Sequence, residues 1–157
     1  MLGGDQMQSR YTLDKNKEGY IDPTACKAIK RADNKLKATE SGEQQALIQW
    51  ADLQSHKHKE LKMLIHIPNQ GKRSREYGAE LKRMGLRAGF PDLFLAVPRM
   101  VDNVLYGGLF IELKVNGNKC TENQKKWLRR LSEQGYKTEV CYGCNEAIKV
   151  IKNYLGI

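Results

Sequence analysis

The chain has 157 residues, of which 40% are hydrophobic and 29% are charged. This length and balance fit one compact domain with a buried core, and they exclude a mostly disordered chain. Lys and Arg outnumber Asp and Glu by 27 to 18, which gives a formal net charge of +9. Such a surface attracts polyanions and favours a nucleic-acid partner, although a merely basic protein would have the same charge.

The sequence offers little sign of export or of a structural metal. No apolar run approaches membrane-spanning length, and the N-terminus lacks the order of a secretory signal, so we expect an intracellular protein without a membrane partner. The four cysteines are Cys26, Cys120, Cys141 and Cys144. One Cys-x-x-Cys without a second pair favours reduced structural thiols over a zinc site.

Residues 1–40 read as a polar, lysine-rich appendage that is partly helical and carries no strand signal. Inside it, "DKNKEGYIDPTA" imitates a calcium-binding loop. Ala25 stands where such a loop needs its bidentate glutamate, and Pro23 intrudes. A calcium site is therefore the weaker interpretation, and the appendage keeps no assigned role.

The domain proper is expected over residues 41–157 and begins with a helix. "SGEQQALIQWADLQSH" has a plausible cap at Ser41 and apolar residues along one helical face. "KMLIHIP" predicts a short strand, and "REYGAELKRMG" predicts a helix that ends at Gly85.

Two strong strands are predicted next. "PDLFLAV" has the continuous apolar run of a strand buried on both faces, with Asp92 at its start. After an irregular connection, "PRMVDNVLYG", the stretch "GLFIELKV" predicts a second buried strand. Because side chains alternate along a strand, Glu112 and Lys114 share one face with Phe110.

The last third of the chain alternates helix, strand and helix. "TENQKKWLRRLSEQG" predicts a helix capped by Thr121 and closed by Gly135. "YKTEVCYG" predicts a strand, and "NEAIKVIKNYL" predicts an amphipathic helix capped by Asn145. The order of elements is that of a mixed α/β domain.

Asp92, Glu112 and Lys114 together suggest chemistry that none of them would suggest alone. Two carboxylates at the ends of neighbouring strands can bind a hard divalent cation such as Mg²⁺. A metal held in this way polarises a phosphate and lowers the pKa of bound water, while a lysine offsets developing charge. These are the groups that phosphodiester hydrolysis requires.

"GFPDLFL" followed about twenty residues later by "FIELK" resembles the PD-(D/E)XK nuclease superfamily, and in particular its VRR-NUC branch. "IPNQG" and "TENQKKWLRRLSEQG" extend the resemblance to roughly residues 41–155. It implies an α/β fold of the restriction-endonuclease-like kind, with a central mixed β-sheet flanked by helices.

The resemblance also implies roles for particular residues. Asp92 and Glu112 would ligate Mg²⁺ or Mn²⁺ with the Leu113 backbone carbonyl, and Lys114 would serve the attacking water. Glu43 matches the family's first-helix glutamate, which approaches the metal site directly or through water. Gln124 matches a helix glutamine near the lysine. As alternatives, Glu43 is a favourable charge at a helix start, and Gln124 forms a local hydrogen bond.

Function follows from the same resemblance: a metal-dependent DNA endonuclease, structure-specific on branched DNA such as a four-way junction or flap, and homodimeric. A non-catalytic nucleic-acid-binding module and a regulatory metal-binding protein remain the alternatives. Basic residues around the acids are candidate phosphate contacts. Those with an assigned DNA-binding role are Lys72, Arg73, Arg75, Arg87, Lys119, Lys125 and Arg129.

The three histidines are given lesser roles. His66 lies between Ile65 and Ile67 on the predicted strand, and we expect it to be half-buried, with a place beside the active site as the alternative. His56 and His58 are two residues apart, a spacing that does not put both on one helical face for metal binding.

Overall fold

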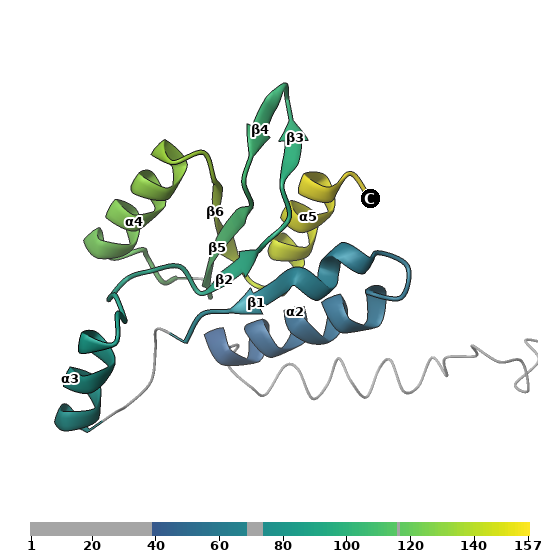
Figure 1. Ribbon diagram of the computed structural model, residues 1–157. Coiled ribbons are helices and arrows are strands. Elements are labelled where there is room, and N and C mark those ends of the chain that lie inside the picture. Colours follow the sequence, from purple (N-terminus) through teal and green to yellow (C-terminus); the bar gives the residue numbers. More distant parts are fainter. Residues whose placement is uncertain (1–38, 69–73, 116) are drawn as a thin grey trace, which may run out of the picture. The chain divides into compact units, whose positions relative to one another are not determined.

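The computed structural model describes residues 39–68, 74–115 and 117–157 (Figure 1). The expectations for residues 1–38, including the calcium-like loop, lie outside these residues, as do Lys72 and Arg73. The helices and strands, in chain order, are α2 (Glu40–Gln54), the 3-10 helix η1 (Lys59–Met63), β1 (Leu64–His66), α3 (Arg75–Arg83), β2 (Leu93–Leu95), β3 (Arg99–Val101), β4 (Val104–Tyr106), β5 (Leu109–Lys114), α4 (Glu122–Glu133), β6 (Lys137–Tyr142) and α5 (Cys144–Leu155).

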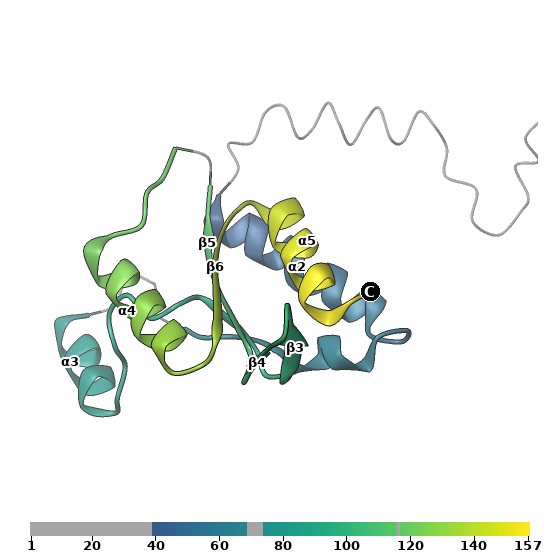
Figure 2. The ribbon, with the colours of Figure 1, turned by 90° about the horizontal axis from the view of Figure 1, so that it is seen from above.

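The central sheet has four strands in the order β1-β2-β5-β6. β2 pairs antiparallel with both β1 and β5, whereas β6 runs parallel to β5, so the sheet is mixed as expected. Figure 2 shows α4 on one side of β5 and β6 and the helices α2 and α5 on the other. The α/β class with a mixed sheet flanked by helices is therefore confirmed.

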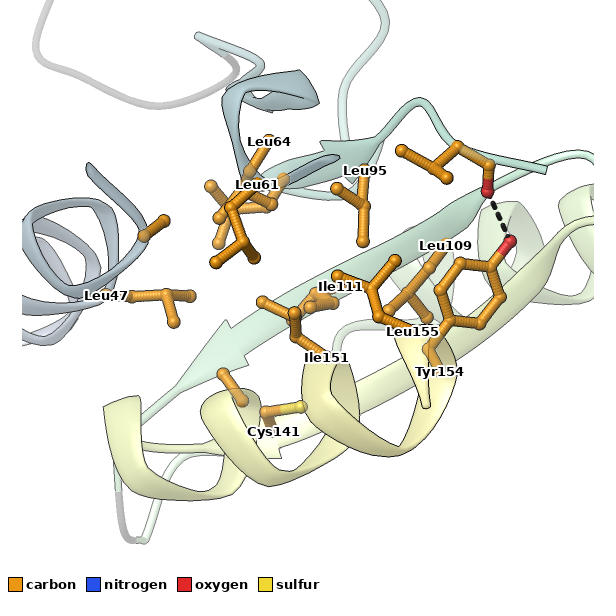
Figure 3. Close-up of a cluster of buried hydrophobic side chains, with 14 of the residues drawn as sticks. Leu47, Leu61, Leu64, Leu95, Leu109, Ile111, Cys141, Ile151, Tyr154 and Leu155 are labelled. Carbon is orange, nitrogen blue, oxygen red and sulfur yellow. Dashed lines mark hydrogen bonds between the residues drawn. The ribbon is translucent and has the colours of Figure 1, made fainter. Parts of the chain in front are cut away.

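One face of the sheet is covered by α2 and α5 and forms an aliphatic core (Figure 3). Leu47 of α2, Ile111 of β5 and Ile151 of α5 are all completely buried. Their burial follows from the alternation of β5 and from the helical spacing of α2 and α5. Each such side chain stabilises the fold by about 1.5–3 kcal/mol relative to an exposed position.

The other face is aromatic. Phe94 and Phe110 stack at 4.2 Å between ring centroids, because they are directly paired across β2 and β5 and so share a face. Phe90 contacts Phe110 edge-on, Tyr136 contacts both rings edge-on, and Trp127 packs against Phe90 in the same way. Both faces of the sheet are thus covered, which explains why β2 and β5 read as nearly continuous apolar runs.

Two predicted helix caps were wrong by two residues. α2 is capped by Thr39 rather than Ser41, because the Thr39 hydroxyl accepts from the Gly42 amide at 3.1 Å. α5 is capped by Gly143 rather than Asn145, which lies inside the helix. Gly143 has φ 90, a left-handed conformation that favours glycine. In both cases an earlier residue had the required backbone geometry.

The connection "PRMVDNVLYG", expected to be irregular, contains the hairpin of β3 and β4. Asp102 and Asn103 join the strands, and both have positive φ, at 49 and 62. Two consecutive left-handed residues are the requirement of a type I′ hairpin turn, and Asp and Asn tolerate that conformation better than most residues. The Asp-Asn pair was the signal that sequence reasoning missed.

Candidate active site

Asp92 lies immediately before β2, next to the end of β5. The strands pair Leu93 with Ile111, so Asp92 falls opposite Glu112 in the antiparallel register. Its Oδ2 accepts a hydrogen bond from the Leu113 amide at 3.1 Å, and the residue is 5% exposed. The sheet therefore brings the two predicted carboxylates to one place, as their positions in the sequence had suggested.

Glu112 and Lys114 form a buried ion pair. Their exposed fractions are 0% and 4%. The Lys114 ammonium donates to Glu112 Oε1 at 2.5 Å and to the Leu113 carbonyl at 3.2 Å. The packing of the neighbouring Phe110 and of the core residues Ile111 and Leu113 holds the strand that presents them.

Gln124, near the start of α4, makes both a local hydrogen bond and a contact with the buried Glu112. Its Oε1 accepts from the Thr121 amide at 2.8 Å, while the Thr121 hydroxyl accepts from the Gln124 amide, forming a capping box. Its Nε2 donates to Glu112 Oε1. The local hydrogen bond thus fixes a side chain that also contacts the buried carboxylate.

Burial dominates the electrostatics of the pair. It raises the pKa of Glu112 to about 7, with the Lys114 ammonium opposing that rise and the Asp92 and Glu40 carboxylates adding to it. Burial alone would lower the pKa of Lys114, but the hydrogen bond to Glu112 and the surrounding carboxylates outweigh it, so this pKa is raised. The cluster holds its lysine as ammonium.

The donor set fits a hard divalent cation in part. Glu112 Oε2 is buried and has no hydrogen-bond partner among the described residues, which is costly for a carboxylate oxygen unless something else binds it. Carboxylate and carbonyl oxygens of this kind suit Mg²⁺ or Mn²⁺. In the described ranges, however, no group of three or more His, Cys, Asp and Glu side chains could hold a metal ion.

Glu40 and Glu43 both lie in the first turn of α2, and sequence reasoning named only Glu43. Its Oε2 accepts from the Cys144 amide at 2.6 Å, so the structure places this carboxylate at the start of α5. Glu40, one turn earlier, lies 3.6 Å from the Lys114 ammonium and accepts from Asn118 at 3.0 Å. Glu40 and Lys114 are far apart in the sequence, so no local sequence pattern indicated this contact.

An open pocket of about 710 Å³ lies beside Lys114. Its wall includes the start of α4 and the Gly117–Lys119 turn, and its lining residues are Glu40, Ala88, Gly89, Lys114, Gly117, Asn118, Lys119, Thr121, Asn123 and Gln124. The pocket gives a bulky ligand access to one end of the buried cluster.

Most of the basic residues named from sequence lie at the surface. Lys119 lines the pocket, whereas Arg87, Lys125 and Arg129 are exposed elsewhere. Lys125 pairs with Glu122 at 2.9 Å, and Arg129 approaches Glu133 at 3.8 Å. Arg75 is the first residue of α3. Among Arg87, Lys119, Lys125 and Arg129, whose side chains the structure describes, only Lys119 lines the pocket.

His66 is exposed, so the expectation of a half-buried histidine was wrong. β1 is an edge strand, and its last residue therefore lacks a covering neighbour on one side. His56 Nδ1 lies 2.6 Å from the Leu53 carbonyl.

The Cys-x-x-Cys pair is divided between β6 and α5. Burial raises the pKa of the Cys141 thiol to about 12, and burial also raises the pKa of Cys144. Both are free thiols. A thiol with so high a pKa is unreactive at neutral pH, which fits a structural role for Cys141.

The domain is an α/β fold whose mixed sheet carries Asp92 at the start of one strand and Glu112 and Lys114 at the end of its neighbour. The chain belongs to the VRR-NUC family: the model of the VRR-NUC domain matches residues 27–145. It is therefore a nuclease-type domain.

A solved structure described as a VRR_NUC domain protein is similar, with a TM-score of 0.63 and 32% sequence identity over 77% of this chain and 92% of the other. No match was found among curated proteins. Over the described residues, the helices are too short or too polar to cross a membrane.

Proposed function

We propose that the protein is a divalent-metal-dependent endonuclease that hydrolyses phosphodiester bonds in DNA. The observation that carries this proposal is the buried, unpartnered Oε2 of Glu112, beside Asp92 and the Lys114 ammonium. Lys114 pairs with Oε1 of this carboxylate, so a bound divalent cation would satisfy the second oxygen, which is costly to bury without a partner. Because the chain belongs to a nuclease-type family, such a cation would serve phosphodiester hydrolysis.

Asp92 and Glu112 are the side chains that would hold Mg²⁺ or Mn²⁺, with the Leu113 carbonyl as a third oxygen donor. The Leu113 carbonyl also accepts from the Lys114 ammonium at 3.2 Å, and its second lone pair is available to a cation. When bound, such a cation supplies Lewis-acid polarisation of a phosphate and acidifies water.

Three further residues would orient the reacting groups or compensate their charge. Lys114 would offset negative charge developing at the phosphate and orient the attacking water, for which its raised pKa keeps it protonated. Gln124 holds the Glu112 carboxylate from the side of α4. Glu40 orients the ammonium from α2, at 3.6 Å.

For the substrate, we propose branched DNA, with a four-way junction or a flap as the leading forms, and action inside the cell. The support is the resemblance of the motifs to the VRR-NUC branch, a net charge of +9 and the open pocket. A homodimer would suit two symmetric cuts in a junction.

The test is gel-resolved cleavage of a labelled four-way junction, with flap and linear duplex of matched length as controls, in Mg²⁺ and in Mn²⁺. Wild type is compared with Lys114→Ala and with Lys126→Ala, an exposed lysine of α4 that does not line the pocket. We expect metal-dependent cleavage by wild type and Lys126→Ala, and none by Lys114→Ala.

Each substrate result has a separate meaning. Cleavage of the flap or the duplex but not the junction would retain the chemistry and change the substrate. Binding of every substrate with no cleavage in either metal would overturn the enzyme and leave a non-catalytic DNA-binding module.

A further inference from the structure

A second groove, of about 320 Å³, runs along α2 next to β1. Four of its lining residues are one or four positions apart on α2, so they belong to one strip of the helix. The groove is lined by Gln44, Gln45, Ile48, Gln49 and His66. It shares no lining residue with the pocket beside Lys114.

His66 faces this groove because of the sheet register. It pairs directly with Leu93 in the antiparallel ladder of β1 and β2, and directly opposed residues share a face. Leu93 is completely buried in the aliphatic core, the side covered by α2. The imidazole therefore lies on the α2 side of the sheet, while the neighbouring Ile65 points to the other side.

The groove adjoins the candidate active site. Gln44 follows Glu40 by one helical turn, about 6 Å along the axis, and Glu40 lines the pocket beside Lys114. The Ile67 amide, next to His66, donates to the Asp92 carbonyl at 2.8 Å. In Figure 1, the start of α2 and the end of β1 both lie at the left of the sheet.

The chemistry of the groove differs from that of a phosphate site. In a chain of net charge +9, none of its described lining residues is Lys, Arg, Asp or Glu. Glutamine side chains carry both donors and an acceptor, which match the edge of a nucleobase. Imidazole stacks on bases, and Ile48 adds an apolar surface.

We propose that this groove binds an unpaired nucleobase of the DNA strand next to the scissile phosphate. The proposal rests on the function proposed above and adds to it a preference for substrates with an unstacked base beside the cut. A base inside a duplex keeps its edge paired and its faces stacked, so it cannot occupy the groove without being extruded.

The test measures DNA binding in EDTA, so that no cleavage occurs, by fluorescence anisotropy. The two labelled probes are a linear duplex and a duplex of equal total nucleotide number that ends in a short single-stranded arm. The proteins are wild type, the double variant Gln49→Ala with His66→Ala, and His66→Phe, which keeps an aromatic ring. Gln54→Ala is the matched control, because it lies on α2 outside the groove.

We expect wild type and Gln54→Ala to bind the armed probe more tightly than the duplex. The double variant should lose about tenfold in affinity for the armed probe, the scale of one stacked base, with duplex affinity unchanged. His66→Phe should keep the preference. Equal loss for both probes, or no preference in wild type, would overturn the proposal.

The same proteins are then assayed for cleavage in Mg²⁺, which separates this proposal from the enzymatic one. If wild type cuts DNA but the double variant keeps its preference for the arm, the groove proposal is wrong and the nuclease remains. If the preference is lost in the double variant but wild type cuts nothing, the groove does bind an unpaired base, whereas the nuclease, and with it a scissile phosphate beside the groove, is wrong.

Discussion

The two halves of β5 are equally buried and chemically opposite. Leu109, Phe110 and Ile111 pack into the two apolar layers, whereas Glu112 and Lys114 place a carboxylate and an ammonium at 0% and 4% exposure. Apolar burial stabilises a fold, but taking two charges out of water costs several kcal/mol per ion before their attraction is counted. One strand thus contributes to the apolar layers in its first half and carries the charged residues of the proposed active site in its second.

The largest expected effect is a loss of DNA cleavage, caused by a change in the charged half of β5. Glu112→Gln keeps the shape of the side chain but removes the negative charge that a divalent cation needs. We expect DNA cleavage in Mg²⁺ to fall by about a thousandfold or more, measured from initial rates on the best substrate. The far-ultraviolet circular dichroism of the variant should match wild type. Retention of most of the cleavage would remove Glu112 from the metal-binding set.

The second prediction concerns the apolar half of β5 and tests stability instead of activity. Ile111→Ala leaves a cavity in the aliphatic core, where Ile111 is completely buried. We expect the free energy of unfolding to fall by about 3 kcal/mol in urea titrations. At a temperature where the variant remains folded, its rate of cleavage should stay within a few-fold of wild type. A loss of cleavage without a loss of stability would contradict the division of β5.

The third effect concerns pH, in protein kept free of metal. Burial raises the pKa of Glu112 from 4.5 to about 7. Between those values the folded state holds a proton that the unfolded state has released, so the stability that this carboxyl contributes falls as pH rises. We expect wild type to lose on the order of 2 kcal/mol between pH 5 and pH 8 relative to Glu112→Gln. Parallel curves for the two proteins would mean that the carboxyl titrates normally.

The smallest effect separates the two contacts of Gln124. Thr121→Ala removes the cap of α4 and should lower the free energy of unfolding by about 1 kcal/mol, with little change in cleavage. Gln124→Ala removes both the capping box and the contact with Glu112, so it should also lower the cleavage rate. Thermal melts and initial rates on the same preparations measure both. Equal loss of cleavage in the two variants would assign the effect to the helix start alone.

The sequence predicted the strands that carry the site because strong local patterns favoured them. β2 and β5 are apolar runs bounded by turns, and the resemblance placed Asp92, Glu112 and Lys114 together. The caps at Thr39 and Gly143 were missed because the choice among neighbouring residues depends on backbone geometry that composition does not specify.

Other parts of the site depend on contacts that no local window contains. Glu43 reaches the amide of Cys144, which is 101 residues later in the chain. Glu40 reaches Lys114 because α2 begins beside the end of β5 (Figure 2). Both glutamates lie in the first turn of one helix, so only the tertiary packing tells which of them faces the buried lysine.

Gly89 is a position at which the packing around the site leaves no room for a side chain. It has φ 79, and a Cβ there would lie 2.8 Å from Asn123 Cβ and 3.0 Å from the Gln124 amide. The backbone just ahead of Asp92 therefore touches the very turn that holds Gln124, with no room between them. In a library randomised at this codon and selected for DNA cleavage, glycine should be almost the sole survivor.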